Sequence, residues 1–205
     1  MAPAEDPPAV SPALRTIADL VLRPADAFRA VRTDPLLTAV LRYGAVFLAT
    51  LVASGILAVI QYNSIVAKYT PRFSVQPFDT LYLPALLQYV LVFTAGPLLL
   101  CLVVHAILRA ACGPKDSRLT LVVVLYAAWP VFLAFGAYEL LAASGISGLW
   151  LVIPVFIAWA AILLVIGLRE VHGLQAREAA LPVIAIVLAL LAGLLLLASL
   201  PPPHG

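Results

Sequence analysis

Five apolar stretches, each long enough to cross a lipid bilayer, recur along this chain of 205 residues. A helix rises about 1.5 Å per residue, so roughly 20 residues cover the ~30 Å hydrocarbon layer. Backbone polar groups inside lipid must be satisfied internally, which a helix achieves within a single segment. The pattern predicts an all-α integral membrane protein with spans at about residues 41–60, 83–108, 119–140, 148–168 and 179–200.

The composition excludes an ordinary soluble domain. Hydrophobic residues make up 64% of the chain and charged residues 11%, against about 25% charged in soluble proteins. No cleavable signal is visible before the first span, because that segment contains Glu5, Asp6 and several prolines but no short apolar core. We therefore expect the first span to be retained as a membrane helix.

The basic residues divide unequally between the two sides of the predicted bundle. Ten of the twelve Lys and Arg residues lie before or at the start of the first span, or in the connections after the second and fourth spans. Lys68 and Arg72, after the first span, are the other two. Because short cytoplasmic loops are enriched in Lys and Arg, we expect the N-terminus inside the cell and the C-terminus outside.

The residues before the first span form a separate unit. Residues 1–10 are rich in Pro and Ala and are expected to be a disordered tail. Ser11 and Pro12 suit the cap and first turn of a helix, and Pro24 starts a second helix. The remaining residues, 35–200, constitute the membrane domain.

Residues 11–34 have an amphipathic pattern. Apolar residues such as Leu20 and Phe28 share one side, and the other side carries Arg23, Arg29 and Arg32. Segments of this kind commonly lie in the membrane interface with the apolar side toward lipid. We expect interfacial helices whose three arginines are candidates for contact with lipid or with a protein partner.

Polar residues inside the predicted spans are scarce, and each is a functional candidate because burying it in lipid is costly. Gln88 and His105 lie in the second span. Glu139 lies near the outer end of the third span, where we expect it to pair with Lys68 or Arg72.

Two sequence patterns suggest metal binding or catalysis, but neither is accompanied, within reach, by the other residues that such a site needs. Cys101 and His105 are one helical turn apart, but no further metal ligands accompany them, so we expect neither metal nor cofactor. Ser147 lies in a G-x-S-G pattern typical of intramembrane serine proteases. His172, its candidate base, would lie about a membrane thickness away, beyond hydrogen-bonding reach. We do not expect an enzyme.

Prolines occur in every predicted span after the first. A proline inside a helix frees the carbonyl four residues earlier, and neighbouring helices must satisfy that group. In the third span Pro130 frees the carbonyl of Tyr126, and Trp129 lies beside it. This bend is a candidate kink or pocket, which Gln88 and His105 would help to line.

Three segments resemble the Yip1 domain family. They are Tyr126 to Pro130 with the preceding connection Lys115 to Leu119, the stretch Leu20 to Val31, and the connection Gly167 to Ala180. The resemblance extends over about residues 14 to 200. It implies a five-span membrane protein with a cytoplasmic N-terminus.

The family resemblance also bears on function. Eukaryotic members take part in vesicle traffic and associate with Rab-type GTPases. This chain lacks the Asp-Leu-Tyr-Gly-Pro element that they have before the first span, which weakens the case for Rab binding. The bias toward Ala, Leu, Arg and Pro with a single Met favours a prokaryotic source, and hence the plasma membrane.

Two functional hypotheses follow. The first is a non-catalytic membrane adaptor that presents a basic cytoplasmic face to lipid, to a membrane or cytoplasmic protein, or to a second copy, and binds no nucleic acid. The alternative is a small transporter or channel subunit, with a pocket among the second, third and fourth spans. Only Gln88 and His105 would supply polar groups to such a pathway, which weighs against transport.

Overall fold

All secondary structure in the described residues of the computed structural model, 12–69, 78–143 and 152–199, is helical. The helices are α1 Pro12–Leu22, α2 Pro24–Val31, α3 Leu36–Tyr69, α4 Phe78–Cys112, α5 Ser117–Ala143, α6 Val152–His172 and α7 Ala176–Ser199. The predicted all-α class is confirmed. The predicted tail 1–10 lies outside the described residues.

Four helices are long and apolar enough to cross a membrane within the described ranges. These candidate spans are Leu36–Ser64, Leu86–Cys112, Ser117–Tyr138 and Ile153–His172. The fifth predicted span falls on α7, most of whose last ten side chains lie outside the described set, so five spans stay a prediction.

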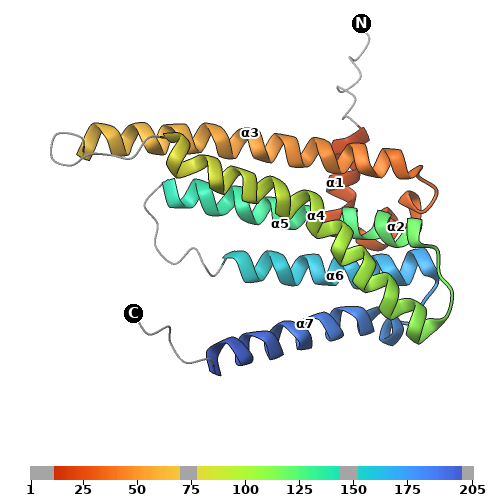
Figure 1. Ribbon diagram of the computed structural model, residues 1–205. Coiled ribbons are helices and arrows are strands. Elements are labelled where there is room, and N and C mark those ends of the chain that lie inside the picture. Colours follow the sequence, from red (N-terminus) through yellow and green to blue (C-terminus); the bar gives the residue numbers. More distant parts are fainter. Residues whose placement is uncertain (1–11, 70–77, 144–151, 200–205) are drawn as a thin grey trace, which may run out of the picture.

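The five long helices run alternately up and down, so that α3, α5 and α7 begin at the end of the bundle where α4 and α6 finish (Figure 1). The short helices α1 and α2 lie at this same end. We call it the basic end, because seven exposed arginines of the described residues lie on its helices and connections: Arg23, Arg29, Arg32, Arg109, Arg118, Arg169 and Arg177.

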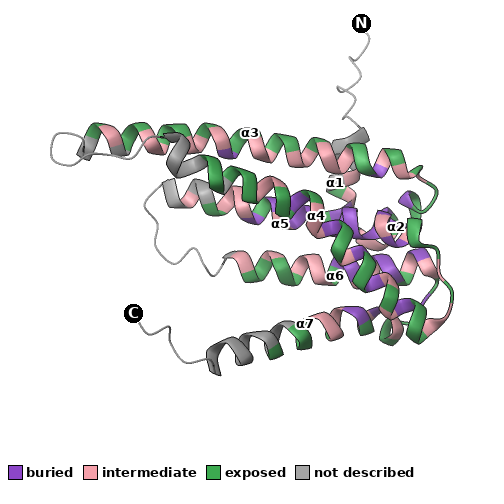
Figure 2. Cartoon of the chain, viewed as in Figure 1, coloured by how far each residue is buried: buried purple, intermediate pink, exposed green. Residues whose placement is uncertain are grey.

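Helix α5 is the centre of the bundle, packing against α3, α4 and α6. In its span 61% of the residues are buried, against 22% or less in the other three spans. Residues 122–127 are buried without interruption, as expected for a helix that is apolar on every side. Figure 2 shows that buried residues gather in α2, α5 and the part of α6 nearest the basic end.

Local capping ends the helices at the basic end. Gly113 and Gly173 adopt positive φ angles of 79° and 64° directly after α4 and α6, a conformation that glycine adopts without strain. After α6, the N–H of Leu174 donates to the carbonyl of Arg169 at 3.1 Å, which is the Schellman closure. Asp116 caps α5 by accepting a hydrogen bond of 2.9 Å from a backbone N–H in its first turn.

Large apolar side chains cover the outside of the long helices. Examples that are more than half exposed occur on α3, α4, α6 and α7: Leu48, Val52, Leu91, Leu99, Val155, Ile162 and Leu188. A surface of this kind is suited to lipid contact, and in water it would be an aggregation hazard. The exposure pattern agrees with the membrane assignment.

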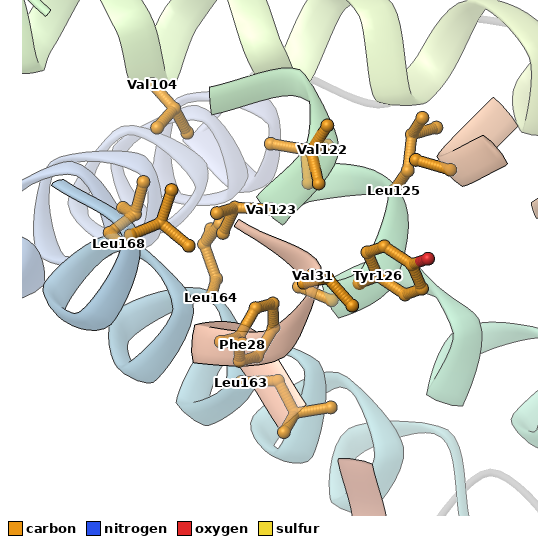
Figure 3. Close-up of a cluster of buried hydrophobic side chains, with 14 of the residues drawn as sticks. Phe28, Val31, Val104, Val122, Val123, Leu125, Tyr126, Leu163, Leu164 and Leu168 are labelled. Atoms are coloured by element: carbon orange, nitrogen blue, oxygen red, sulfur yellow. The ribbon is translucent and has the colours of Figure 1, made fainter. Parts of the chain in front are cut away.

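The apolar side of α2 packs on protein, where the sequence predicted contact with lipid. Phe28 and Val31 are buried in the core, with 0% and 3% of their surface exposed, and α2 lies against α6. Figure 3 shows Phe28 among side chains of α5 and α6. Gly167 makes this possible, because a Cβ there would lie 2.6 Å from Val123 Cγ1 and 2.7 Å from Phe28 Cε1. The expectation that these two residues face lipid is therefore wrong.

A cluster of aromatic rings joins α3, α4 and α5: Tyr43, Phe47, Tyr89, Phe93, Phe132 and Phe135. Within it, Pro97 cannot donate a backbone hydrogen bond, so the carbonyl of Phe93 loses its partner within α4. The Tyr43 hydroxyl donates to this carbonyl at 2.6 Å. A side chain from α3 thus satisfies the group that the proline frees.

Candidate functional site

The three predicted surface arginines lie together at the basic end but differ in whether the side chain forms hydrogen bonds with other described residues. Arg23 joins α1 to α2, Arg32 follows α2, and both side chains are exposed. Arg29 is also exposed but is held in place, because its Nε donates to Glu170 at 2.7 Å and its Nη1 to Asp26 at 3.2 Å. Arg23 and Arg32 are therefore freer to meet a ligand than Arg29 is.

Glu170 fixes α2 to α6. Besides Arg29, its carboxylate accepts hydrogen bonds from Arg169, at 2.6 Å for Nη2 and 3.0 Å for Nε. The hydrogen bond to Glu170 raises the pKa of Arg29, which keeps its guanidinium charged. No sequence pattern indicates this pairing, since Arg29 and Glu170 are 141 residues apart.

A second ionic group lies where α2 leads into α3. Arg42 Nη1 donates to the Asp34 carboxylate at 2.7 Å and to the Tyr126 hydroxyl at 2.7 Å. Tyr126 in turn donates to the same Asp34 oxygen at 3.2 Å. The side chains of Arg42 and Asp34 are only 28% and 22% exposed. The group ties α3 to α5 and to the connection that follows α2.

Next to this group is a cavity of about 230 Å³ between α1, α3 and α5. Its wall is mostly apolar, with Leu20, Val46 and Leu125 among the lining residues. Arg42 and Tyr126 contribute polar atoms, and Trp129 adds its indole. The indole N–H of Trp129 is buried and has no hydrogen-bond acceptor in the described part of the chain.

The five residues of the predicted kink or pocket do not all come together. Tyr126 and Trp129 of α5 line the cavity, and the remaining lining residues come from α1 and α3. Gln88 is exposed on α4, and His105 is half-buried on that helix, facing Thr120. Pro130 is buried in α5. The cavity in the described part of the chain lies between α1, α3 and α5, and its lining includes Tyr126 and Trp129 but neither Gln88 nor His105.

His105 belongs to a hydrogen-bonded group that joins α4, α5 and α6. Its Nδ1 lies 3.4 Å from Thr120 Oγ1, and His172 Nε2 lies 3.1 Å from the same oxygen. Thr120 donates its own proton to the carbonyl of Asp116 at 3.2 Å, so each imidazole is in position to donate to it. Thr120 is fully buried. No three His, Cys, Asp or Glu side chains gather as metal ligands in the described ranges.

The pairing of short N-terminal helices with a bundle of long apolar helices can now be compared with known families. The Yip1 domain profile matches residues 18–198, which is most of the chain. The chain belongs to the Yip1 domain family. Neither the curated proteins nor the solved structures contain a match.

The Yip1 match begins within α1 and ends within α7. The docked helix α2, the Arg42 group and the cavity residues from residue 18 onward are therefore parts of the Yip1 domain. The predicted outer ion pair cannot be placed, because the side chains of Glu139 and Lys68 and the whole of Arg72 lie outside the described residues.

Proposed function

We propose that this Yip1-domain protein is a non-catalytic membrane adaptor that crosses a prokaryotic plasma membrane five times, with its N-terminus in the cytoplasm. Its basic end engages the anionic headgroups of a lipid surface. The observation that carries the proposal is the concentration of exposed guanidinium groups at one end of the bundle, where the short N-terminal helices also lie.

The arrangement of these charges supports a binding surface. Arg23 and Arg32 are exposed at the two ends of α2, while Phe28 and Val31 anchor that helix in the core between them. A charged surface on an anchored helix loses little conformational entropy on binding. Basic residues next to a membrane are attracted to anionic lipid by about 1 kcal/mol each.

The transport alternative receives less support from the side chains of the bundle. Gln88 is exposed on α4, and His105 is engaged with Thr120. Most buried residues of α5 are apolar, and the polar groups against it are engaged with one another near the basic end, whereas an ion pathway needs several polar groups along one route. The adaptor is therefore the function that we favour.

Vesicle recruitment tests the proposal. The protein is placed in nanodiscs of phosphatidylcholine, and the binding of fluorescent vesicles is measured by flotation, with and without phosphatidylglycerol in the vesicles. We expect binding only to the anionic vesicles. We expect the Arg23→Gln/Arg32→Gln variant to bind at least tenfold more weakly at low salt.

The matched control is Lys68→Gln/Arg72→Gln, which removes the same charge from the end of α3 and from the connection that follows it. It should bind as the unmodified protein does. Equal binding by both double variants, or equal binding to neutral vesicles, would refute anionic-lipid recognition by the basic end. If the nanodiscs retain another protein but bind no vesicles, the basic end recognises a protein partner instead.

A further inference from the structure

The cavity between α1, α3 and α5 combines an apolar wall with two kinds of hydrogen-bond donor. Its lining includes the apolar side chains Leu20, Val46 and Leu125. Its volume of about 230 Å³ exceeds the roughly 150 Å³ at which an apolar cavity binds benzene, so it can hold a hydrocarbon group. The donors are the guanidinium of Arg42 and the indole of Trp129.

Arg42 has unused donor capacity. The guanidinium carries five N–H groups, and its hydrogen bonds to Asp34 and Tyr126 both start from Nη1. Nε and Nη2 bond to no other described side chain. Arginine presents such paired N–H groups to phosphate in a bidentate geometry.

Trp129 supplies the second donor. The residue is only 6% exposed, and its Nε1 lacks an acceptor in the described part of the chain. A buried polar group without a partner is destabilising, so an acceptor brought by a ligand would bind favourably. Tyr126 and Trp129 are three residues apart, hence on one face of α5 and separated by about one turn along it.

We propose that this cavity binds one glycerophospholipid. Its phosphate meets Nε and Nη2 of Arg42, an ester carbonyl accepts the hydrogen bond of Trp129, and the first methylene groups of an acyl chain enter the apolar part of the cavity, while the rest of the lipid lies outside it. Arg42 bonds to Tyr126, which lies about one turn from Trp129 on α5, so both donors belong to the lining of the same cavity. Asp34 neutralises much of the charge on Arg42, so the site does not require a headgroup of net negative charge.

The position of the site in the fold suits this occupant. Arg42 is seven residues into α3, and Asp34 directly precedes that helix, so the ionic group is near the basic end where lipid phosphates lie. Arg118, in the first turn of α5, donates to the backbone carbonyl of Asp34 at 3.2 Å and so holds the connection between α2 and α3 against α5. The site uses neither Arg23 nor Arg32 and is independent of the proposed vesicle binding.

Native mass spectrometry of the full chain in detergent tests the proposal, with phosphatidylcholine as the added ligand. We expect one lipid per chain to remain bound as detergent is increased. Val46→Phe places a ring in the cavity lining and should strongly reduce retention, while Val52→Phe, on the exposed side of the same helix, should retain the lipid. Trp129→Phe keeps the ring but loses the donor, and should weaken binding about fivefold.

Fluorescence quenching gives a second readout that does not depend on detergent. In a Trp150→Phe/Trp159→Phe background, Trp129 is the sole tryptophan. Phosphatidylcholine brominated near the ester should quench it with saturation at low molar ratio, and Val46→Phe should remove that saturable component. Adding Arg23→Gln/Arg32→Gln to this background should leave the quenching of Trp129 unchanged, even if vesicle recruitment fails.

Three outcomes would overturn the proposal. Quenching that rises only in proportion to the membrane fraction of brominated lipid would show ordinary lipid contact. Diacylglycerol binding as tightly as phosphatidylcholine would show that no phosphate is recognised. Dimerisation that Val46→Phe abolishes, without lipid retention, would show that a second copy fills the cavity.

Discussion

At the scale of single residues, the contact of Phe28 with Gly167 explains how the N-terminal helices join the bundle. Phe28 and Val123 are both 0% exposed, and both approach Gly167 more closely than a Cβ atom would allow. The benzyl ring cannot retreat within a closely packed core. The absence of a side chain at this position is thus a requirement of the packing of α2 on α6.

Replacing Gly167 with Ala should therefore destabilise the protein. We expect a loss of about 1–3 kcal/mol from overpacking, seen as a lower melting temperature in detergent by circular dichroism. Gly136→Ala is the control, because a Cβ at that position of α5 meets nothing within 4 Å. It should leave stability unchanged or raise it by up to about 1 kcal/mol. An unchanged melting temperature for Gly167→Ala would contradict the observed approach of α2 to α6.

Thr120 offers a second test at the same scale. Its hydroxyl donates to the carbonyl of Asp116 and lies within hydrogen-bonding distance of His105 and His172. Thr120→Val keeps the shape but removes these hydrogen bonds in a fully buried site, which should cost about 1–3 kcal/mol.

The matched substitution for Thr120→Val is Thr94→Val on α4. The Thr94 hydroxyl is exposed and bonds to carbonyls of its own helix. Chemical denaturation in mixed micelles should show little change for Thr94→Val and a clear loss for Thr120→Val. Equal effects would mean that the two imidazoles do not depend on Thr120.

At the scale of helices, the proline in α4 and the tyrosine in α3 form a matched pair. Tyr43→Phe removes the donor that satisfies the Phe93 carbonyl and should cost about 1–3 kcal/mol. In a Pro97→Ala background the backbone N–H is restored to α4, so the same Tyr43→Phe change should cost measurably less. The double-mutant cycle is read from thermal unfolding of all four proteins. Additive effects would disprove the pairing.

Helix existence follows from the sequence better than helix packing does. Long apolar stretches predict α3, α4, α5 and α6 because lipid leaves the backbone few alternatives. Pro12 and Pro24 stand at the first residues of α1 and α2, where a missing N–H costs nothing. Pro154, by contrast, is the third residue of α6 in the described part of the chain, whereas the sequence predicted it inside a span.

The packing of α2 lay beyond sequence reasoning for a physical reason. Inside a membrane both lipid and the protein core are apolar. The sequence around Phe28 therefore does not distinguish a side chain that contacts lipid from one that packs on protein. The pairing of Arg42 with Tyr126 likewise depends on how α3 meets α5, across 84 residues of chain. Tyr126 and Trp129 were recognised as candidates for a pocket, but the helices that complete the cavity were not.

At the scale of the whole molecule, the account depends on which side of the membrane the basic end occupies. The connections Gly113 to Asp116 and Gly173 to Gln175 lie at the same end as α1 and α2 (Figure 1). The enrichment of Lys and Arg at this end predicts that it faces the cytoplasm. If α7 is a fifth span, as we propose, the C-terminus lies outside.

Cysteine labelling tests that arrangement most directly. The only two cysteines, Cys101 and Cys112, are replaced by Ala, and Lys115→Cys, Arg72→Cys and His204→Cys are made one at a time. Intact spheroplasts are treated with a maleimide that cannot cross the membrane, and labelling after lysis is the positive control. We predict labelling from outside at positions 72 and 204 but not at 115. Labelling at 115 with protection of 72 would show that the basic end faces outward, which contradicts the proposed orientation. Protection of 204 alone would show that α7 does not cross the membrane.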